Sequence, residues 1–370
     1  MVRAGYRRTD VGVIPDEWEV ALLDSVAKRG SGHTPDKAHP EYWGGPVRWI
    51  SLQDSNRLDR GYIDDTAAKI TVAGIANSSA KLHPAGTVVL SRDAGVGKSA
   101  IMQEAMAVSQ HFMAWTCGPS LKNEFLYYWL QANKAEFERI AMGNTIKTIG
   151  LPYFRRLRIP LPEVGEQLAI AGALRDADAL IESLEQLLAK KRHLKQGAMQ
   201  ELLTGKERLP GFTGSWAERT LAALFDFSGG LSASRDQLSG EGHCYLHYGD
   251  IHGSSRAFID VTSEFQDIPK LNVPLKKVVS KSLLADGDVV FVDASEDDEG
   301  TSKHVVIVNR DQIPFISGLH TIVAKSRTDE LSHLYRRYCF QTRSVKQQFR
   351  FFSVGTKVSG ISKTNIAKVT

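Results

Sequence analysis

The sequence has few cysteines and no long apolar run, and both absences narrow the kind of protein it encodes. Its three cysteines, Cys117, Cys244 and Cys339, are far apart, so they form neither a zinc-ligand spacing nor a disulfide framework. No apolar segment approaches the roughly 18 residues that a membrane-spanning helix needs, and the charged N-terminus is unlike a signal peptide. We therefore expect a protein of the cytoplasm with no membrane segment.

Signatures of catalysis and of metal binding are also missing. His243, Cys244, His247 and His252 lie close in sequence, but their spacing matches no common zinc pattern. No nucleophile with its base, no catalytic carboxylate pair and no cofactor motif of an adenine methyltransferase stands out. The sequence therefore predicts no catalytic residue, no metal and no cofactor.

Acidic residues are absent from two segments. The segment from Arg139 to Pro162 contains five basic residues, and the segment from Leu331 to Thr370 contains eight. Segments of one charge sign attract polyanions such as nucleic acids. A solvated surface is the alternative for either segment alone, but the two occupy matching places in an internal repeat, which favours a binding face.

The chain contains one pattern twice. Residues 54–66 and 250–262 align without a gap, with identities at Asp54/Asp250, Arg60/Arg256, Ile63/Ile259, Asp64/Asp260 and Thr66/Thr262. A second match aligns GNTIKTIGLPYFRRL, from Gly143, with GTKVSGISKTNIAKV, from Gly355. Each copy has the size of a small domain, about 150 residues. We predict that each is an α+β domain with short strands at 47–50, 87–90, 288–292 and 304–308 and a later helix, near 123–140 in the first copy and 331–349 in the second.

A long helix is predicted between the copies, from Glu166 to Leu203. Its length of about 38 residues corresponds to about 57 Å. Apolar residues follow one another at three- and four-residue steps, and the opposite face is charged, which is typical of a coiled-coil seam. The seam residues are Ile170, Leu174, Ala177, Ile181, Leu184 and Leu188. No second such segment is present, so we expect either that the chain is truncated before its partner helix or that the seam pairs with another polypeptide.

The stretch IPLPEVGEQLAIAGALRDADALIESLEQLLAKKRHLKQGAMQELLTGKERLPGF, from Ile159 to Phe212, resembles the central conserved region of specificity subunits of type I restriction–modification systems. The combination of Ile159-Pro-Leu-Pro162, Glu166-Gln167, Lys195-Gln196 and Leu202-Leu-Thr-Gly-Lys206 carries the resemblance. The flanking copies, which open near Trp18 and Trp216, resemble the two target-recognition domains of that family.

The resemblance implies a first recognition domain at 1–158, a central region with the spacer helix at 159–208 and a second recognition domain at 209–370. It also implies a subunit without catalytic activity that binds a bipartite target on double-stranded DNA. Two methyltransferase subunits and, through them, restriction and motor subunits would be its partners. The family usually carries a second conserved helix after the second recognition domain, and this sequence lacks it; that helix or a second copy would fill the seam.

Candidate DNA contacts are the polar and basic residues of loops, because such side chains reach base edges and phosphates. In the first copy they are Lys28, Arg29, His33, Thr34, Gln53, Ser55, Arg92, Lys98, Asn144 and Lys147. In the second copy they are Ser234, Arg235, Tyr248, His252, Lys357, Ser359 and Lys363. For the first loop of each copy, an ordinary surface loop is the alternative. Asp54 and Asp250 are identical in both copies, so we expect them to cap a turn and not to read bases.

The segment SRDAGVGKSA, residues 91–100, suggests a different function, that of a nucleotide hydrolase. It follows an apolar run, as a phosphate-binding loop does, but Arg92 occupies the position of the first glycine. The acidic second motif of such an enzyme would be Val289–Asp293. The repeat aligns this segment with the strand before Arg92, so the two motifs would lie in different domains. We therefore expect a Gly-rich loop whose Arg92 and Lys98 face DNA. A coiled-coil scaffold with incidental basic patches is the third hypothesis.

Overall fold

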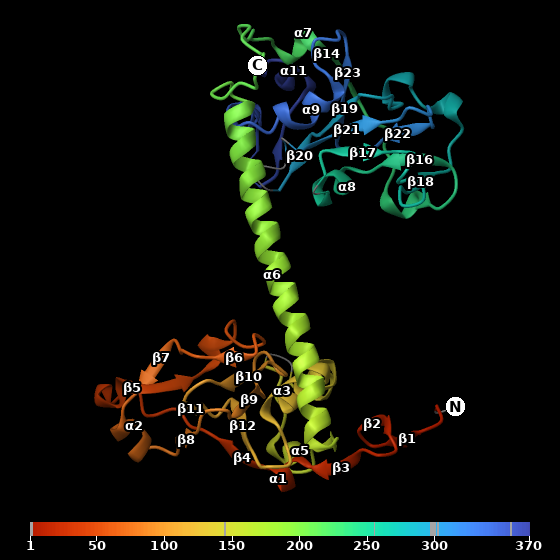
Figure 1. Cartoon of the computed structure of the whole chain (residues 1–370). Helices are drawn as coiled ribbons and strands as arrows, with labels where there is room; N and C mark the ends of the chain where they lie inside the picture. The colour runs from red at the N-terminus through yellow and green to blue at the C-terminus, as the bar shows by residue number, and fades with distance from the viewer. Residues whose placement is uncertain (1–2, 144–145, 255, 297–300, 302, 356) are drawn as a thin grey trace. The chain divides into compact units, whose positions relative to one another are not determined.

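The computed structural model describes residues 3–143, 146–254, 256–296, 301, 303–355 and 357–370. The chain forms two compact units, Met1–Gln186 and Leu187–Thr370, here called unit 1 and unit 2. The 39-residue helix α6 (Val164–Leu202) is continuous from one unit into the other (Figure 1). The predicted α+β class with a long helix between two domains is confirmed. The finer division at residues 158 and 208 stays a prediction.

Unit 1 is built on two sheets. The five-stranded sheet has the order β4 (Ala27–Ser31), β12 (Phe112–Cys117), β9 (Val88–Ser91), β10 (Ser99–Met102), β6 (Tyr62–Ile63). The four-stranded sheet has the order β7 (Ala68–Ile70), β5 (Trp43–Ile50), β11 (Met106–Val108), β8 (Leu82–His83). The remaining strands pair as β1 (Tyr6–Thr9) with β2 (Gly12–Pro15) and as β3 (Glu19–Leu22) with β13 (Arg158–Leu161). The helices are α1 (Leu23–Val26), α2 (Val72–Ala76), α3 (Asn123–Ala132), α4 (Lys134–Ile140) and α5 (Leu151–Phe154), with 3-10 turns η1 (Pro40–Tyr42) and η2 (Leu52–Asp54).

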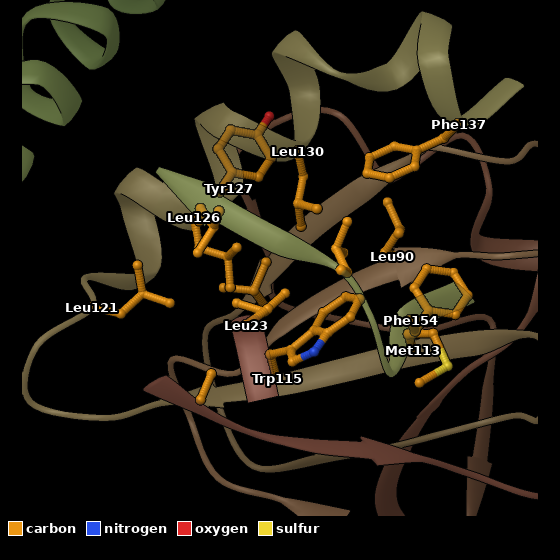
Figure 2. Packing of buried hydrophobic residues seen from close by; sticks show 14 of the residues in the cluster. Leu23, Leu90, Met113, Trp115, Leu121, Leu126, Tyr127, Leu130, Phe137 and Phe154 are labelled. Atoms are coloured by element: carbon orange, nitrogen blue, oxygen red, sulfur yellow. The ribbon is translucent and has the colours of Figure 1, made fainter. Parts of the chain in front are cut away.

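The core of unit 1 lies between its five-stranded sheet and helices α3, α4 and α5. Figure 2 shows Leu126, Leu130 and Phe137 of the helices gathered with Trp115 and Leu90 of the sheet, and all of these side chains are buried. The burial of such side chains contributes roughly 2 kcal/mol each. The sheet thereby becomes a rigid base for the loops at its ends.

Unit 2 repeats this plan. Its five-stranded sheet has the order β14 (Phe225–Gly229), β23 (Thr321–Ser326), β19 (Val289–Val292), β21 (His304–Val308), β17 (Phe258–Asp260). Its four-stranded sheet has the order β15 (Leu238–Ser239), β18 (Lys270–Leu271), β16 (His243–Leu246), β22 (Phe315–Ser317), and β20 (Ala294–Ser295) pairs with β24 (Ser359–Gly360). The helices are α7 (Leu221–Leu224), α8 (Tyr248–Gly253), α9 (His333–Cys339), α10 (Arg343–Phe352) and α11 (Lys363–Ile366), with 3-10 turns η3 (Arg235–Gln237), η4 (Leu275–Lys277) and η5 (Ser280–Ser282).

The internal repeat is confirmed by strand pairing. The short strands of the first match, β6 and β17, both run parallel to their neighbours, β10 and β21. Three apolar pairs of the second match are buried in both units, Ile149 and Ile361, Phe154 and Ile366, Leu157 and Val369, whereas the fourth, Ile146 and Val358, is exposed. The strands predicted from the apolar runs are present as β5, β9, β19 and β21.

The later helix of each copy was predicted as one segment, and this was wrong in both units. In unit 1, Asn133 separates α3 from α4, with a backbone outside the helical region and its side-chain amide bonded to the carbonyl oxygen of Trp129 at 2.8 Å. In unit 2, Thr342 separates α9 from α10 and caps the second helix through the amide of Val345. Side chains of this kind compete for backbone groups and so divide a helical pattern.

Helix α6 is anchored in unit 1 by two polar residues of its first turn, Glu166 and Gln167. The buried side chain of Gln167 accepts a hydrogen bond from the amide of Lys122 at 2.8 Å and donates to the carbonyl oxygens of Ser120 and Pro162 at 2.9 and 2.8 Å. The indole of Trp18 donates to Glu166 at 3.0 Å. Both residues of Glu166-Gln167 therefore have structural roles.

Most of the seam of α6 is not covered by other described residues. Ile170 packs against the core of unit 1, but Leu174, Ala177, Ile181, Leu184 and Leu188 are exposed. About half of the surface of Leu184 and Leu188 is accessible, 54% and 50%. Among the described residues, no helix is both long and apolar enough to cross a membrane.

Candidate nucleic-acid interface

Four loops of unit 1 meet where β9 ends and β12 begins; residues 51–56, 92–98, 109–111 and 146–149 are here called loop cluster 1. Backbone hydrogen bonds join them: the amide of Arg92 donates to the carbonyl of His111 and the amide of Ile149 to that of Arg92, both at 2.9 Å. The amide of Ser109 donates to Ile50 at 2.9 Å. Loops that are distant in sequence therefore form one surface.

Several candidate DNA contacts of the first copy lie in or beside loop cluster 1. The ammonium group of Lys98 donates to the carbonyl oxygen of Ser55 at 2.9 Å, and the hydroxyl of Thr34 donates to Gln110 at 2.7 Å. Gln53 and Lys147 are exposed. Asn144 lies outside the described residues.

The phosphate-loop-like segment is a β-hairpin. Strands β9 and β10 pair antiparallel, with Leu90 opposite Ser99, and the amide of Ser91 donates to the carbonyl of Lys98 at 2.8 Å. Gly95 and Gly97 have φ values of 108° and 86°, which only glycine adopts without strain. A phosphate-binding loop leads from a strand into a helix, whose N-terminus holds the phosphates, so the hairpin confirms the Gly-rich loop that the sequence predicted.

Arg92 is held inward. Its side chain is 18% exposed and its Nε lies 3.6 Å from Asp93 Oδ1. Lys98 is half-buried against Ser55. Both residues lie in loop cluster 1, and a role for either in binding phosphate stays a prediction.

The shared aspartates cap turns, as the sequence predicted. The carboxylate of Asp54 is buried and accepts hydrogen bonds from the amides of Ser51, at 2.9 Å, and Ala67, at 2.7 Å. Asp250 accepts from the amide of His247 at 3.2 Å. Burial lowers the pKa of His247, with Arg235 acting in the same direction, and the neutral ring accepts a hydrogen bond from the amide of Gly249 at 3.1 Å.

Unit 2 has a matching loop cluster 2, formed by residues 247–253, 293–295, 318–320 and 357–361. The amide of Asp293 donates to the carbonyl of His320 at 3.1 Å and the amide of Ile361 to that of Asp293 at 2.8 Å. These bonds repeat the two that join Arg92 to His111 and Ile149 in unit 1. The same ends of the same strands therefore carry both clusters.

Loop cluster 2 surrounds an open hollow with a volume of about 720 Å³. Two candidate residues, Tyr248 and His252, line it together with His320, Glu296 and Val358. The ring of Tyr248 meets those of His252 and His320 edge-on, with centroids 6.1 and 5.4 Å apart. Aromatic and imidazole groups therefore form one wall of the hollow.

The other candidates of the second copy are not among the residues that line this hollow. Arg235 binds Asp250 of α8 at 2.9 Å, and the hydroxyl of Ser234 contacts Gln237 at 3.2 Å. Lys357 is exposed, and Ser359 pairs with Ser295 in the short β20–β24 ladder. The side chain of Lys363 lies over Gly229 at the end of β14.

Lys28 and Arg29 lie away from loop cluster 1. They face Thr116 and Trp115, toward the end of β12 that is remote from His111. Arg29 also forms an ion pair with Asp24 at 3.2 Å. Exposed His33 is closer to the cluster, because it precedes Thr34, and its carbonyl accepts a hydrogen bond from Trp49. The structure does not bring Lys28 and Arg29 to the cluster, and their contact with DNA stays a prediction.

Sequence reasoning missed four residues of the clusters: Asp93, His111, Asp293 and His320. The signal was present, because His111 and His320 each stand directly before the last long strand of their sheet, β12 and β23. No group of three or more His, Cys, Asp or Glu in the described parts of the chain could hold a metal ion.

Comparison with known proteins agrees with this fold. Residues 15–190 match the family described as the type I restriction modification DNA specificity domain. The specificity subunit of the type I restriction enzyme MjaIX from Methanocaldococcus jannaschii is 29% identical over 180 residues, which are 48% of this chain and 42% of that protein. The MjaVIII specificity subunit of the same organism is 21% identical over 351 residues, 92% of this chain and 75% of that protein. The chain thus spans less than half the length of the first relative.

The fold has a counterpart among solved structures. The crystal structure of a type I restriction–modification S subunit from M. genitalium superposes with a TM-score of 0.53, at 17% identity, over 95% of this chain and 83% of that one. The chain therefore shares the fold of that S subunit. By sequence, residues 15–190 match the specificity domain of this family, and over 92% of its length the chain is similar to a type I specificity subunit.

Proposed function

We propose that the chain is the DNA-recognition subunit of a type I restriction–modification complex. The observation that carries the proposal is the duplication of the loop cluster, which stands at the same strand ends in both units. Each acid-free segment of the sequence contributes its loop to one cluster, 146–149 in unit 1 and 357–361 in unit 2. We assign the DNA contacts to these clusters and no catalytic residue to the chain.

Each unit is proposed to bind one half of a bipartite target in double-stranded DNA. The clusters share their backbone but differ in side chains: Gln53 and Ser55 stand where unit 2 has Gly249 and Ile251. Amide side chains suit adenine and exposed lysines such as Lys147 and Lys357 suit phosphates. Different half-sites follow from the different side chains on one scaffold.

Helix α6 is proposed to set the spacing of the half-sites and to bind partners. At 1.5 Å per residue its 39 residues extend about 58 Å. The exposed seam supports a helix partner, from a second copy of this chain or from another polypeptide, because an apolar stripe of this kind is normally covered. Two methyltransferase subunits, and through them restriction and motor subunits, would complete the assembly.

The proposal is tested by co-expressing the chain with its methyltransferase subunit and mapping methylated adenines in the host genome. A bipartite motif with an unread spacer is the expected result. Methylation at a continuous motif, or none that depends on this chain, would contradict the proposal. Tight binding of a fluorescent ATP analogue that is lost in Lys98→Ala would favour the nucleotide-hydrolase hypothesis instead.

The seam is tested separately by placing a charge within it. Leu184→Lys combined with Leu188→Lys should abolish association with the helix partner while both units remain folded, because buried lysines without a partner charge are costly. Gln186→Lys, on the charged side of the same helix turn, is the matched control. Equal association of the two variants in size-exclusion chromatography would show that the seam does not bind a helix partner. This result would also contradict the coiled-coil scaffold hypothesis, which needs the same contact.

A further inference from the structure

Each loop cluster contains a histidine held by an aspartate. In unit 1, Nδ1 of His111 lies 2.8 Å from Oδ2 of Asp93. In unit 2, Nδ1 of His320 lies 3.3 Å from Oδ1 of Asp293. Both histidines stand one residue before a central strand, β12 or β23, and both aspartates stand just beyond the facing strand, β9 or β19.

The pair is rebuilt in the two units and is not a simple copy. In the alignment of β9 with β19, Asp93 faces Ala294, and Asp293 faces Arg92. The carboxylate therefore comes from adjacent positions, yet it meets the same ring nitrogen in both units. If the aspartate were needed only for the backbone, it would occupy the same aligned position in both units. What the two units share instead is the contact between aspartate and histidine.

The geometry leaves one ring nitrogen of each histidine available. An ionised carboxylate only accepts hydrogen bonds, so Nδ1 donates to it. Nε2 is on the far side of the ring from the carboxylate, and no hydrogen bond to it is found for either histidine within the described residues. The side chains are 33% and 48% exposed. Each ring is thus oriented by the aspartate and accessible from solvent.

We propose that His111 and His320 bind DNA phosphates, one in each half-site, with Asp93 and Asp293 as the residues that position them. This inference rests on the proposed function and names two contacts of the same interface. In the bound state both ring nitrogens would donate hydrogen bonds, Nδ1 to the carboxylate and Nε2 to the phosphate.

A phosphate is favoured over a base because both units carry the same group. The units are proposed to read different half-sites, so a group that reads bases should differ between them. Phosphates are common to all sequences and fix the position of the protein on the duplex. The nearby loops 146–149 and 357–361 bring Lys147 and Lys357, whose charge favours the same ligand.

The test compares the full-length chain with a His111→Gln, His320→Gln variant. The probe is a fluorescein-labelled 40-base-pair duplex of random sequence, titrated at several salt concentrations. Glutamine keeps a polar side chain of similar reach but removes the charge. Each lost phosphate contact reduces the slope of log K against log salt by about 0.9, so we expect a decrease of about 2 and at least about tenfold weaker binding at low salt.

Matched controls come from two other histidine–carboxylate pairs, one in each unit, whose carboxylates stand before the first residue of a strand. His39 lies 2.8 Å from Glu41, before the start of β5, and His333 lies 3.5 Å from Asp286, before β19. Their side chains are 49% and 51% exposed, much like the pair in unit 2. The His39→Gln, His333→Gln variant should keep the affinity and slope of the unaltered chain.

The outcomes separate the two proposals. If the unaltered chain does not bind the duplex, the proposed function fails, and this inference fails with it. If the unaltered chain binds, but the His111 and His320 variant retains its salt slope, only the inference is overturned. A reduced slope accompanied by a melting temperature several degrees lower would assign the pairs a structural role and also overturn it.

Discussion

The amide nitrogen of Leu23 donates a hydrogen bond of 2.8 Å to the carbonyl oxygen of Leu157, at the two ends of the first copy. Leu221 and Val369 make the same bond, at 2.7 Å, in the second copy. In each unit, this hydrogen bond therefore joins the first segment of the copy to its last segment. This closure explains how α6 can connect two units that each have their own core.

The anchor of α6 is expected to be sensitive to one side chain. Gln167→Ala removes three hydrogen bonds, to the amide of Lys122 and the carbonyls of Ser120 and Pro162, and the last of these is in a buried position. We expect a loss of about 3 kcal/mol in the free energy of unfolding of unit 1, measured by urea denaturation. Gln186→Ala, on the exposed part of the helix, is the control and should change it by less than about 0.5 kcal/mol.

The hairpin at 91–99 is expected to depend on glycine at position 97. Gly97→Ala puts a Cβ 2.8 Å from Cγ of Lys134, at a φ of 86° that other residues rarely adopt. We expect a loss of about 1–3 kcal/mol. Gly172→Ala is a suitable comparison, because an added Cβ meets nothing there within 4 Å and alanine favours the helix; thermal unfolding should show it unchanged or more stable.

Unit 1 should lose stability in mild acid through His83. Burial lowers the pKa of this histidine, with Lys81 and Lys28 acting in the same direction. The unfolded chain therefore takes up a proton near pH 6.5, where the folded chain does not, so the free energy of unfolding falls as the pH decreases from 7 to 5. His83→Gln should reduce this pH dependence in thermal denaturation. An identical decrease in both proteins would refute the assignment.

The length of α6 should determine the unread spacer. An insertion of seven residues between Ala177 and Leu194 adds about two turns and about 10 Å, which corresponds to roughly three base pairs at 3.4 Å each. We expect methylation mapping to show both half-sites unchanged and a longer spacer. Altered half-sites would mean that the helix takes part in base recognition.

Local patterns were sufficient for several features of this protein. The apolar seam of α6 and the strands 87–90 and 304–308 depend on residues close together in the chain, and the duplication appears when two short segments are aligned, so all of these were visible in the sequence. Even the capping roles of Asp54 and Asp250 followed from their identity in both copies. The break at Asn133 was missed because a single capping side chain ends a pattern that is otherwise helical.

The composition of the loop clusters was decided by the tertiary structure. The antiparallel register of β12 with β4 carries Arg29, a predicted contact, toward one end of the sheet and His111, which the sequence analysis did not single out, to the other. The pairs of His111 with Asp93 and of His320 with Asp293 join residues 18 and 27 positions apart. Such contacts depend on which strands are neighbours, and strand order is set by the packing of the whole unit and not by any local segment.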